Sequence, residues 1–158
     1  MMATPRLHVL ALGLVALSAT AMLMAADSSG PMQPEEIKWG PAPPDLPAGA
    51  QIAVLAGDPS QSGPVTLRLK MPAGYVIAPH WHPTDERVTV ISGLLGLGMG
   101  DTLDKKTSKV LKPGGYAVAP AKMHHFAWTK AGAIVQVDLM GPFAITYLNA
   151  ADDPSKKK

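Results

Sequence analysis

Residues 74–93 read GYVIAPHWHPTDERVTVISG and hold His80, His82 and Glu86 within seven positions. In an extended strand, residues i and i+2 face the same side, so the two imidazoles are expected to point together. The three residues that follow His82, PTD, predict a tight turn. Glu86 then begins a returning strand. We expect a β-hairpin that brings its carboxylate next to the two imidazoles, as a metal site requires.

A second segment supplies the other histidines of the chain after its first 26 residues. It is PGGYAVAPAKMHHFAWT, residues 113–129, with His124 and His125. Histidines spread over a surface would not gather in two short segments. Because a strand turns only one of two adjacent side chains inward, this pair offers one further ligand, and the alternation leaves open which of the two it is.

The chain from residue 51 onward has the pattern of many short strands. Apolar or alternating runs such as QIAVLA at 51–56, ERVTVI at 86–91 and AIVQVDLM at 133–140 are separated by Gly, Pro and Asp clusters. No segment keeps a helical apolar period without interruption by Gly or Pro. The pattern predicts a single all-β domain built as a sandwich or barrel.

The two histidine segments resemble the two motifs of the cupin superfamily, in particular small single-domain bacterial cupins. The first motif is glycine, five residues, His-x-His, three or four residues, glutamate, six residues and glycine. Its matches here are Gly74, His80, His82, Glu86 and Gly93. The second motif is matched at Gly114, Pro120 and His125, and departs at Lys122 and Thr129, where glycine and asparagine are usual.

This resemblance implies a double-stranded β-helix, a jelly-roll-like barrel, over residues 51–148. It also implies one divalent metal ion held by His80, His82, Glu86 and His125, with His124 outside the site. Lys122 would matter for the turn if that position requires positive φ. Thr129 can still hydrogen-bond to nearby backbone. The alternative is a barrel that keeps these residues without a metal and pairs Glu86 with a histidinium.

The first 26 residues read as a secretory signal peptide, with one charge at Arg6, an apolar run and alanines. We place the cleavage between residues 21 and 26 and expect a periplasmic or secreted bacterial protein. The alternative is an uncleaved membrane anchor. With cleavage, no stable membrane insertion is expected.

The segments that flank the barrel differ from it in composition. Residues 27–50 are rich in proline, which disfavours a helix or a central strand. We expect an extended arm anchored by Ile37 and Trp39, and a loose linker is the alternative. Residues 149–158 end in three lysines and are expected to form a solvated basic tail.

Composition limits the partners and the ligand chemistry. The formal net charge is +2, so no nucleic-acid footprint is expected. The chain has no cysteine, so a metal must be held by nitrogen and oxygen. Imidazoles with a carboxylate suit Mn, Fe, Ni, Cu, Co or Zn, and the sequence does not choose among them. The family resemblance and the apolar outer faces that a small barrel would otherwise expose lead us to expect a homodimer, with the proline-rich arm as its clasp.

Two functions follow from these expectations. The first is an exported metal-dependent enzyme of the dioxygenase, isomerase, decarboxylase or lyase type that acts on a small oxygen-rich molecule, as many cupins do. The second is a non-enzymatic periplasmic binder or sensor of a metal or small ligand. It is supported by the other inward strand positions, which read as Val, Ala, Leu and Gly and hold no second titratable cluster. No catalytic residue is assigned.

Overall fold

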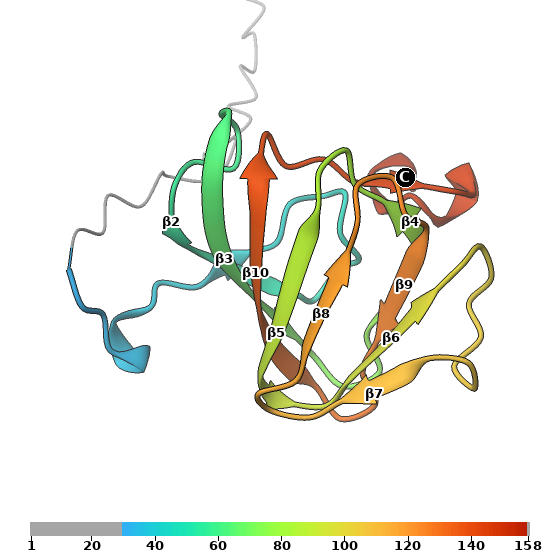
Figure 1. Cartoon of the computed structure of the whole chain (residues 1–158), viewed down its shortest axis with the longest axis horizontal. Helices are drawn as coiled ribbons and strands as arrows, with labels where there is room; N and C mark the ends of the chain where they lie inside the picture. Colours follow the sequence, from blue (N-terminus) through green and yellow to red (C-terminus); the bar gives the residue numbers. More distant parts are fainter. Residues whose placement is uncertain (1–29, 158) are drawn as a thin grey trace, which may run out of the picture.

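The computed structural model describes residues 30–157, and their architecture is two antiparallel β-sheets packed face to face (Figure 1). The first sheet has six strands, in the spatial order β1 (Gly40–Pro41), β2 (Gln51–Ala56), β3 (Gly63–Met71), β10 (Ala133–Gly141), β5 (Glu86–Gly93) and β8 (Tyr116–Ala119). The second has five, in the order β11 (Thr146–Tyr147), β4 (Val76–Trp81), β9 (His125–Trp128), β6 (Leu95–Met99) and β7 (Lys109–Leu111). This is the predicted all-β cupin architecture.

The core lies between the inner faces of the two sheets. Along β3, buried and half-buried residues alternate, so that Leu67 and Leu69 face inward while Arg68 and Lys70 face outward. The long strand β10 repeats this alternation beside it, with Val135 and Val137 buried. Each aliphatic side chain removed from water in this way contributes about 1.5–3 kcal/mol to folding.

Consecutive strands of the motif region alternate between the sheets, which overturns the predicted β-hairpin. Strand β4 pairs with β9 and β11, whereas β5 pairs with β10 and β8. The short connection between β4 and β5 therefore crosses from one sheet to the other. The physical reason is burial: each strand has one apolar face, and two sheets packed face to face bury the apolar faces of both sheets against each other. Glu86 consequently approaches the histidines from the opposite sheet.

A second, smaller apolar cluster lies on the outer face of the five-stranded sheet. Phe126 is fully buried there, and Trp128 donates a hydrogen bond from Nε1 to Ser108 Oγ at 2.9 Å. The rings of Phe126 and Trp128 lie against glycines of β6. At Gly98, an added Cβ would overlap the Phe126 ring. The loop that carries Ser108 therefore covers this face of the sheet.

The N-terminal segment is in contact with the barrel. Strand β1 pairs with β2, and Leu46 and Ala50 are buried in the core. The two expected anchors are half-buried: Ile37 follows the 3-10 helix Pro34–Glu36, and the ring of Trp39 lies 4.5 Å from Lys70 Nζ. Leu46 and Ala50, which the sequence did not single out, are the residues of this segment that enter the core.

The C-terminal residues expected to form a solvated tail contain two short 3-10 helices, Ala150–Asp152 and Pro154–Lys156. The side chains of Asn149 and Asp153 cap them by accepting backbone hydrogen bonds. Within residues 30–157, no helix has the length and hydrophobicity needed to cross a membrane. The predicted signal peptide lies outside the described residues.

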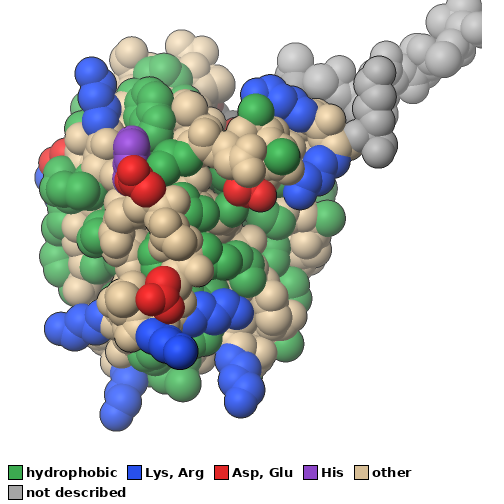
Figure 2. Space-filling model, turned by 90° about the vertical axis from the view of Figure 1, so that its right-hand side faces the viewer, with side chains coloured by type: hydrophobic (Ala, Val, Ile, Leu, Met, Phe, Trp, Pro, Cys, Tyr) green, Lys and Arg blue, Asp and Glu red, His purple; other side chains and the backbone are tan. Residues whose placement is uncertain are grey.

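Charged side chains are dispersed on the face of the molecule drawn in Figure 2, where hydrophobic side chains fill much of the area between them. Large hydrophobic residues that are exposed on the described surface include Met99, Leu103, Val110 and Met123. Exposed hydrophobic residues are common on monomers, so they mark no site by themselves.

Candidate metal centre

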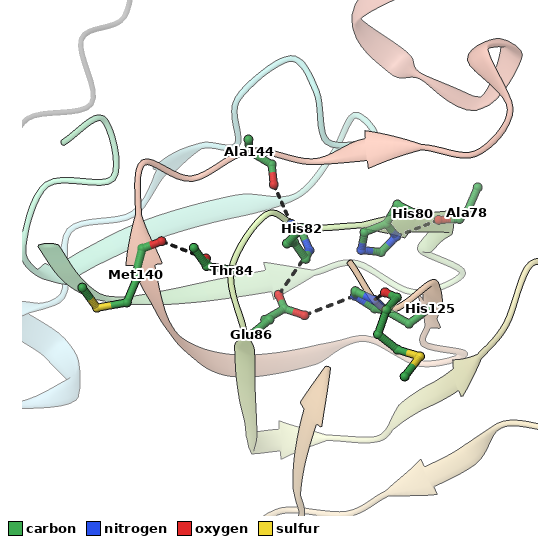
Figure 3. Close-up of polar contacts among 9 residues, drawn as sticks. Ala78, His80, His82, Thr84, Glu86, His125, Met140 and Ala144 are labelled. Carbon is green, nitrogen blue, oxygen red and sulfur yellow. Dashed lines mark hydrogen bonds and ion pairs between the residues drawn. The ribbon is translucent and has the colours of Figure 1, made fainter. Parts of the chain in front are cut away.

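Three histidine side chains converge inside the barrel near one end of the strands that carry them (Figure 3). His80 lies near the end of β4, His82 directly follows that strand, and His125 begins β9, where it pairs with His80. All three are buried, with 3%, 7% and 1% of their surface exposed. One ring nitrogen from each lies within 4.8 Å of the others, which is close enough for all three to bind a single ion.

The carboxylate of Glu86 completes the group from the opposite sheet. Its Oε1 lies 3.8 Å from His82 Nε2, and its Oε2 lies 3.3 Å from His125 Nε2. Only 14% of the side chain is exposed. The structure thus brings together the four side chains that the sequence predicted as ligands.

Backbone carbonyls orient all three imidazoles. The Nδ1 atoms of His80 and His125 lie 2.8 and 2.9 Å from the carbonyl oxygens of Ala78 and Met123, each two residues earlier in the chain. His82 Nδ1 lies 2.7 Å from the carbonyl oxygen of Ala144. A carbonyl can only accept, so each Nδ1 carries the hydrogen and donates it. In a neutral ring, Nε2 then keeps a lone pair, and this is the tautomer that binds metal.

The surroundings of His125 Nε2 indicate whether these residues fit a cation. It is buried and has no hydrogen-bond partner, because the nearby Glu86 carboxylate is not aligned for a hydrogen bond. A neutral imidazole and a carboxylate both direct lone pairs into the space between them. That arrangement is repulsive unless a cation or a proton lies there, so the donor set fits a divalent ion.

The pKa values of the group follow from its burial and its charges. Burial, with the neighbouring His125 and His82, lowers the pKa of His80 to about 3 and keeps this ring neutral. Burial alone would raise the pKa of Glu86, but contact with His125 and the charges of His82 and His125 lower it overall. Burial is the largest single influence on the pKa of His125 and lowers it, but Glu86 and the Met123 carbonyl together raise the pKa overall. The carboxylate therefore favours the protonated form of His125 relative to a free imidazole.

The second motif folds as its spacing predicts. His124 points away from the cluster, with 40% of its side chain exposed and its Nδ1 2.7 Å from Asp101 Oδ1. Lys122 adopts a φ of 63°, so the turn keeps its left-handed residue although a side chain is present. Thr129 is buried and accepts a hydrogen bond from Gly132 N at 3.2 Å.

An apolar cavity opens beside the cluster, with an empty volume of about 370 Å³ that includes its opening. His80, His82 and Glu86 form its polar wall. The remaining walls are aliphatic or aromatic: Leu46, Ile52, Leu67, Leu69, Ile77, Val137, Phe143 and Ile145. Sequence reasoning missed Leu46, Phe143 and Ile145. No motif marks them: Leu46 is an apolar side chain isolated in a proline-rich segment, and Phe143 and Ile145 belong to the short apolar run FAITYL at 143–148.

Similar solved structures have the cupin fold. The polyketide cyclase RemF from Streptomyces resistomycificus matches with a TM-score of 0.67 and 15% identity, over 82% of this chain and 92% of the cyclase. An RmlC-like cupin from Shewanella frigidimarina matches with 0.55 and 17%, over 72% and 91%. KdgF from a Halomonas species matches with 0.54 and 21%, over 73% and 94%. At such identities the likeness concerns the fold alone.

Sequence comparison adds a family but no characterised relative. A search of curated proteins finds no match. One family model, described as a domain of unknown function (DUF4437), matches residues 28–146. This range includes both histidine motifs, the strands that carry them and the N-terminal segment that lines the cavity. The chain therefore belongs to the DUF4437 family and has the cupin fold.

Proposed function

We propose that the chain is a metal-dependent enzyme that acts on a small molecule in the cavity beside His80, His82, Glu86 and His125. The observation that carries this proposal is the arrangement of three buried imidazole lone pairs and one carboxylate around a common point. This point borders a partly open cavity whose walls are largely apolar. A site built for structure alone would have no need of such space.

The chain contributes orientation of the ligands and an apolar surrounding. Hydrogen bonds from Nδ1 to the backbone hold each imidazole in one rotamer and one tautomer, which preorganises the donors. The aliphatic walls lower the polarity around the site, which strengthens electrostatic interactions within it. A divalent ion held by these four side chains would supply Lewis-acid or redox chemistry with coordination positions left for an oxygen donor. RemF, a protein of this fold, is named as a cyclase, which agrees with small-molecule chemistry.

A second candidate is a non-enzymatic binder or sensor of a metal or small ligand. It is favoured by one observation: the cavity walls hold no titratable side chain other than His80, His82 and Glu86. Enzymes commonly place a further acid or base within reach of the reacting atoms. This candidate requires the same metal and differs in the absence of turnover.

Metal analysis combined with water-proton relaxation separates these candidates. The purified protein should hold one divalent ion per chain, and the Mn²⁺-loaded form should enhance water-proton relaxation through exchangeable water. Tightly bound zinc without an exchangeable position would contradict the enzyme and leave the binder or sensor. A protein that takes up no divalent ion would contradict both.

Export and dimerisation complete the proposal. The composition of residues 1–26 supports export to the periplasm or medium, and N-terminal sequencing should show that the exported protein begins between residues 22 and 27.

Tyr116 and Val118 are exposed on β8, the last strand of its sheet, which supports a homodimer. Light scattering of the purified protein should give twice the mass of one chain, and a single-chain mass would contradict the dimer.

A further inference from the structure

We infer that this cavity takes a ligand with an uncharged, apolar body and oxygen donors at one end, and that Leu46 from the proline-rich segment is a specificity-determining residue. The inference rests on the proposed function, since the oxygen donors would meet the ion held by the four ligands. It goes further by naming the chemical class of the rest of the ligand and the residue that selects it.

The distribution of charge around the cavity excludes a charged ligand body. A ligand with a second carboxylate or a phosphate would need a cationic partner, because burying an unpaired charge is costly. The cavity walls contain no lysine or arginine. The nearest positive residues of the lining strand β3, Arg68 and Lys70, face outward, where Arg68 donates to Gln136 and Lys70 lies over Trp39. An uncharged hydrocarbon or aromatic body suits these walls.

Two tyrosines fix the position of Leu46. Tyr147 donates a hydrogen bond to the carbonyl oxygen of Asp45 at 2.9 Å, and Tyr75 donates one to that of Pro47 at 2.6 Å. These carbonyls flank Leu46 on both sides. Burial raises the pKa of both tyrosines, so both hydroxyls stay protonated and able to donate. Leu46 is thereby held with only 7% of its surface exposed, as a wall that faces the cavity.

A second part of the cavity walls comes from the segment after β10. Its Ala144 carbonyl orients His82, and the flanking residues Phe143 and Ile145 line the cavity. The ring centroid of Phe143 lies 5.5 Å from that of His82. Apolar contact therefore begins directly beside a metal ligand, where the body of a bound molecule would start.

Three hydroxamates with the same chelating head test the inference on metal-loaded protein by calorimetric titration. Acetohydroxamate has a methyl body, benzohydroxamate an uncharged ring, and succinic monohydroxamate a carboxylate. We expect benzohydroxamate to bind at least about tenfold more tightly than acetohydroxamate, because its ring buries additional apolar surface. The carboxylate compound should bind more weakly than either. Leu46→Ala should remove about threefold to tenfold of the benzohydroxamate affinity and leave acetohydroxamate unchanged.

Leu103→Ala, at an exposed leucine outside the cavity walls, is the matched control and should change neither affinity. Phe143→Leu provides a second wall variant should Leu46→Ala fail to fold. Equal affinities for the first two hydroxamates, or preference for the carboxylate compound, would overturn the inference while leaving the metal site intact. An affinity that responds equally to the wall variants and the control would overturn the role of Leu46. Failure of the protein to take up metal would overturn the proposed function and this inference together.

Discussion

Replacement of His125 by alanine removes one predicted ligand and allows its role to be compared with that of its neighbour. His125 is 1% exposed and its Nε2 faces Glu86, whereas His124 is partly exposed and bonds to Asp101. The two residues are adjacent and of the same type. A metal-dependent stabilisation should therefore be lost in His125→Ala and kept in His124→Ala.

The magnitude follows from linkage between metal binding and folding. Free metal at about 100 times the dissociation constant stabilises the folded state by about 2.7 kcal/mol. For a chain of this size, about 2–4 °C in melting temperature corresponds to 1 kcal/mol, so the wild type should gain about 5–11 °C. Loss of a ligand should weaken binding by about 100-fold or more, since even indirect partners of a ligand contribute 10–100-fold. At the same free metal, about 0.4 kcal/mol then remains, which corresponds to about 1–2 °C.

The assay is thermal unfolding by circular dichroism with and without Mn²⁺, Co²⁺ or Zn²⁺ at buffered free concentration. Each variant is compared with its own metal-free form, which cancels any change in basal stability caused by the substitution. A full shift in His125→Ala would refute the assignment of this ligand. A lost shift in His124→Ala would mean that the strand register is off by one.

Three further predictions concern packing and pH. Gly98→Ala should destabilise the fold by about 1–3 kcal/mol because its Cβ would overlap the Phe126 ring; Gly40→Ala, which meets no atom, should not, and equal denaturant midpoints would contradict the packing. In the metal-free protein, His80 has a pKa of about 3, below the ordinary 6.5, so the unfolded state binds its proton first as pH falls. The free energy of unfolding should therefore drop by up to about 1.4 kcal/mol per pH unit between pH 6.5 and 3 through this residue. If urea unfolding of His80→Ala gave the same dependence of that free energy on pH as the wild type, the prediction would be contradicted. Bound metal should be lost as pH falls below about 6, because protons compete for the imidazoles, and metal content that is constant down to pH 4 would refute imidazole ligation.

The sequence predicted the strands well because most of them carry a two-residue apolar period bounded by Gly or Pro. The run QIAVLA coincides with β2, and ERVTVI lies within β5. It also predicted that His125 rather than His124 faces His80, through the spacing from Pro120. The strands follow from local alternation, which a single sequence contains, whereas the choice of His125 came from the resemblance to the second cupin motif.

The errors concern long-range arrangement. A short turn between two strands allows either a hairpin or a crossing between sheets, so the connection between His82 and Glu86 was assigned to the wrong geometry. Leu46 was missed because its burial depends on two tyrosines far along the chain, Tyr75 and Tyr147. No local pattern contains such contacts.

The measurement that tests the central claim most directly is X-ray absorption spectroscopy of the metal-loaded protein. It reports the atoms bound to the ion and resolves imidazole scattering. We predict one ion per chain with three imidazole nitrogens at about 2.0–2.2 Å and carboxylate or water oxygens in the remaining positions. A coordination shell without imidazole, or one unchanged in His125→Ala, would contradict a shared ion held by His80, His82, Glu86 and His125.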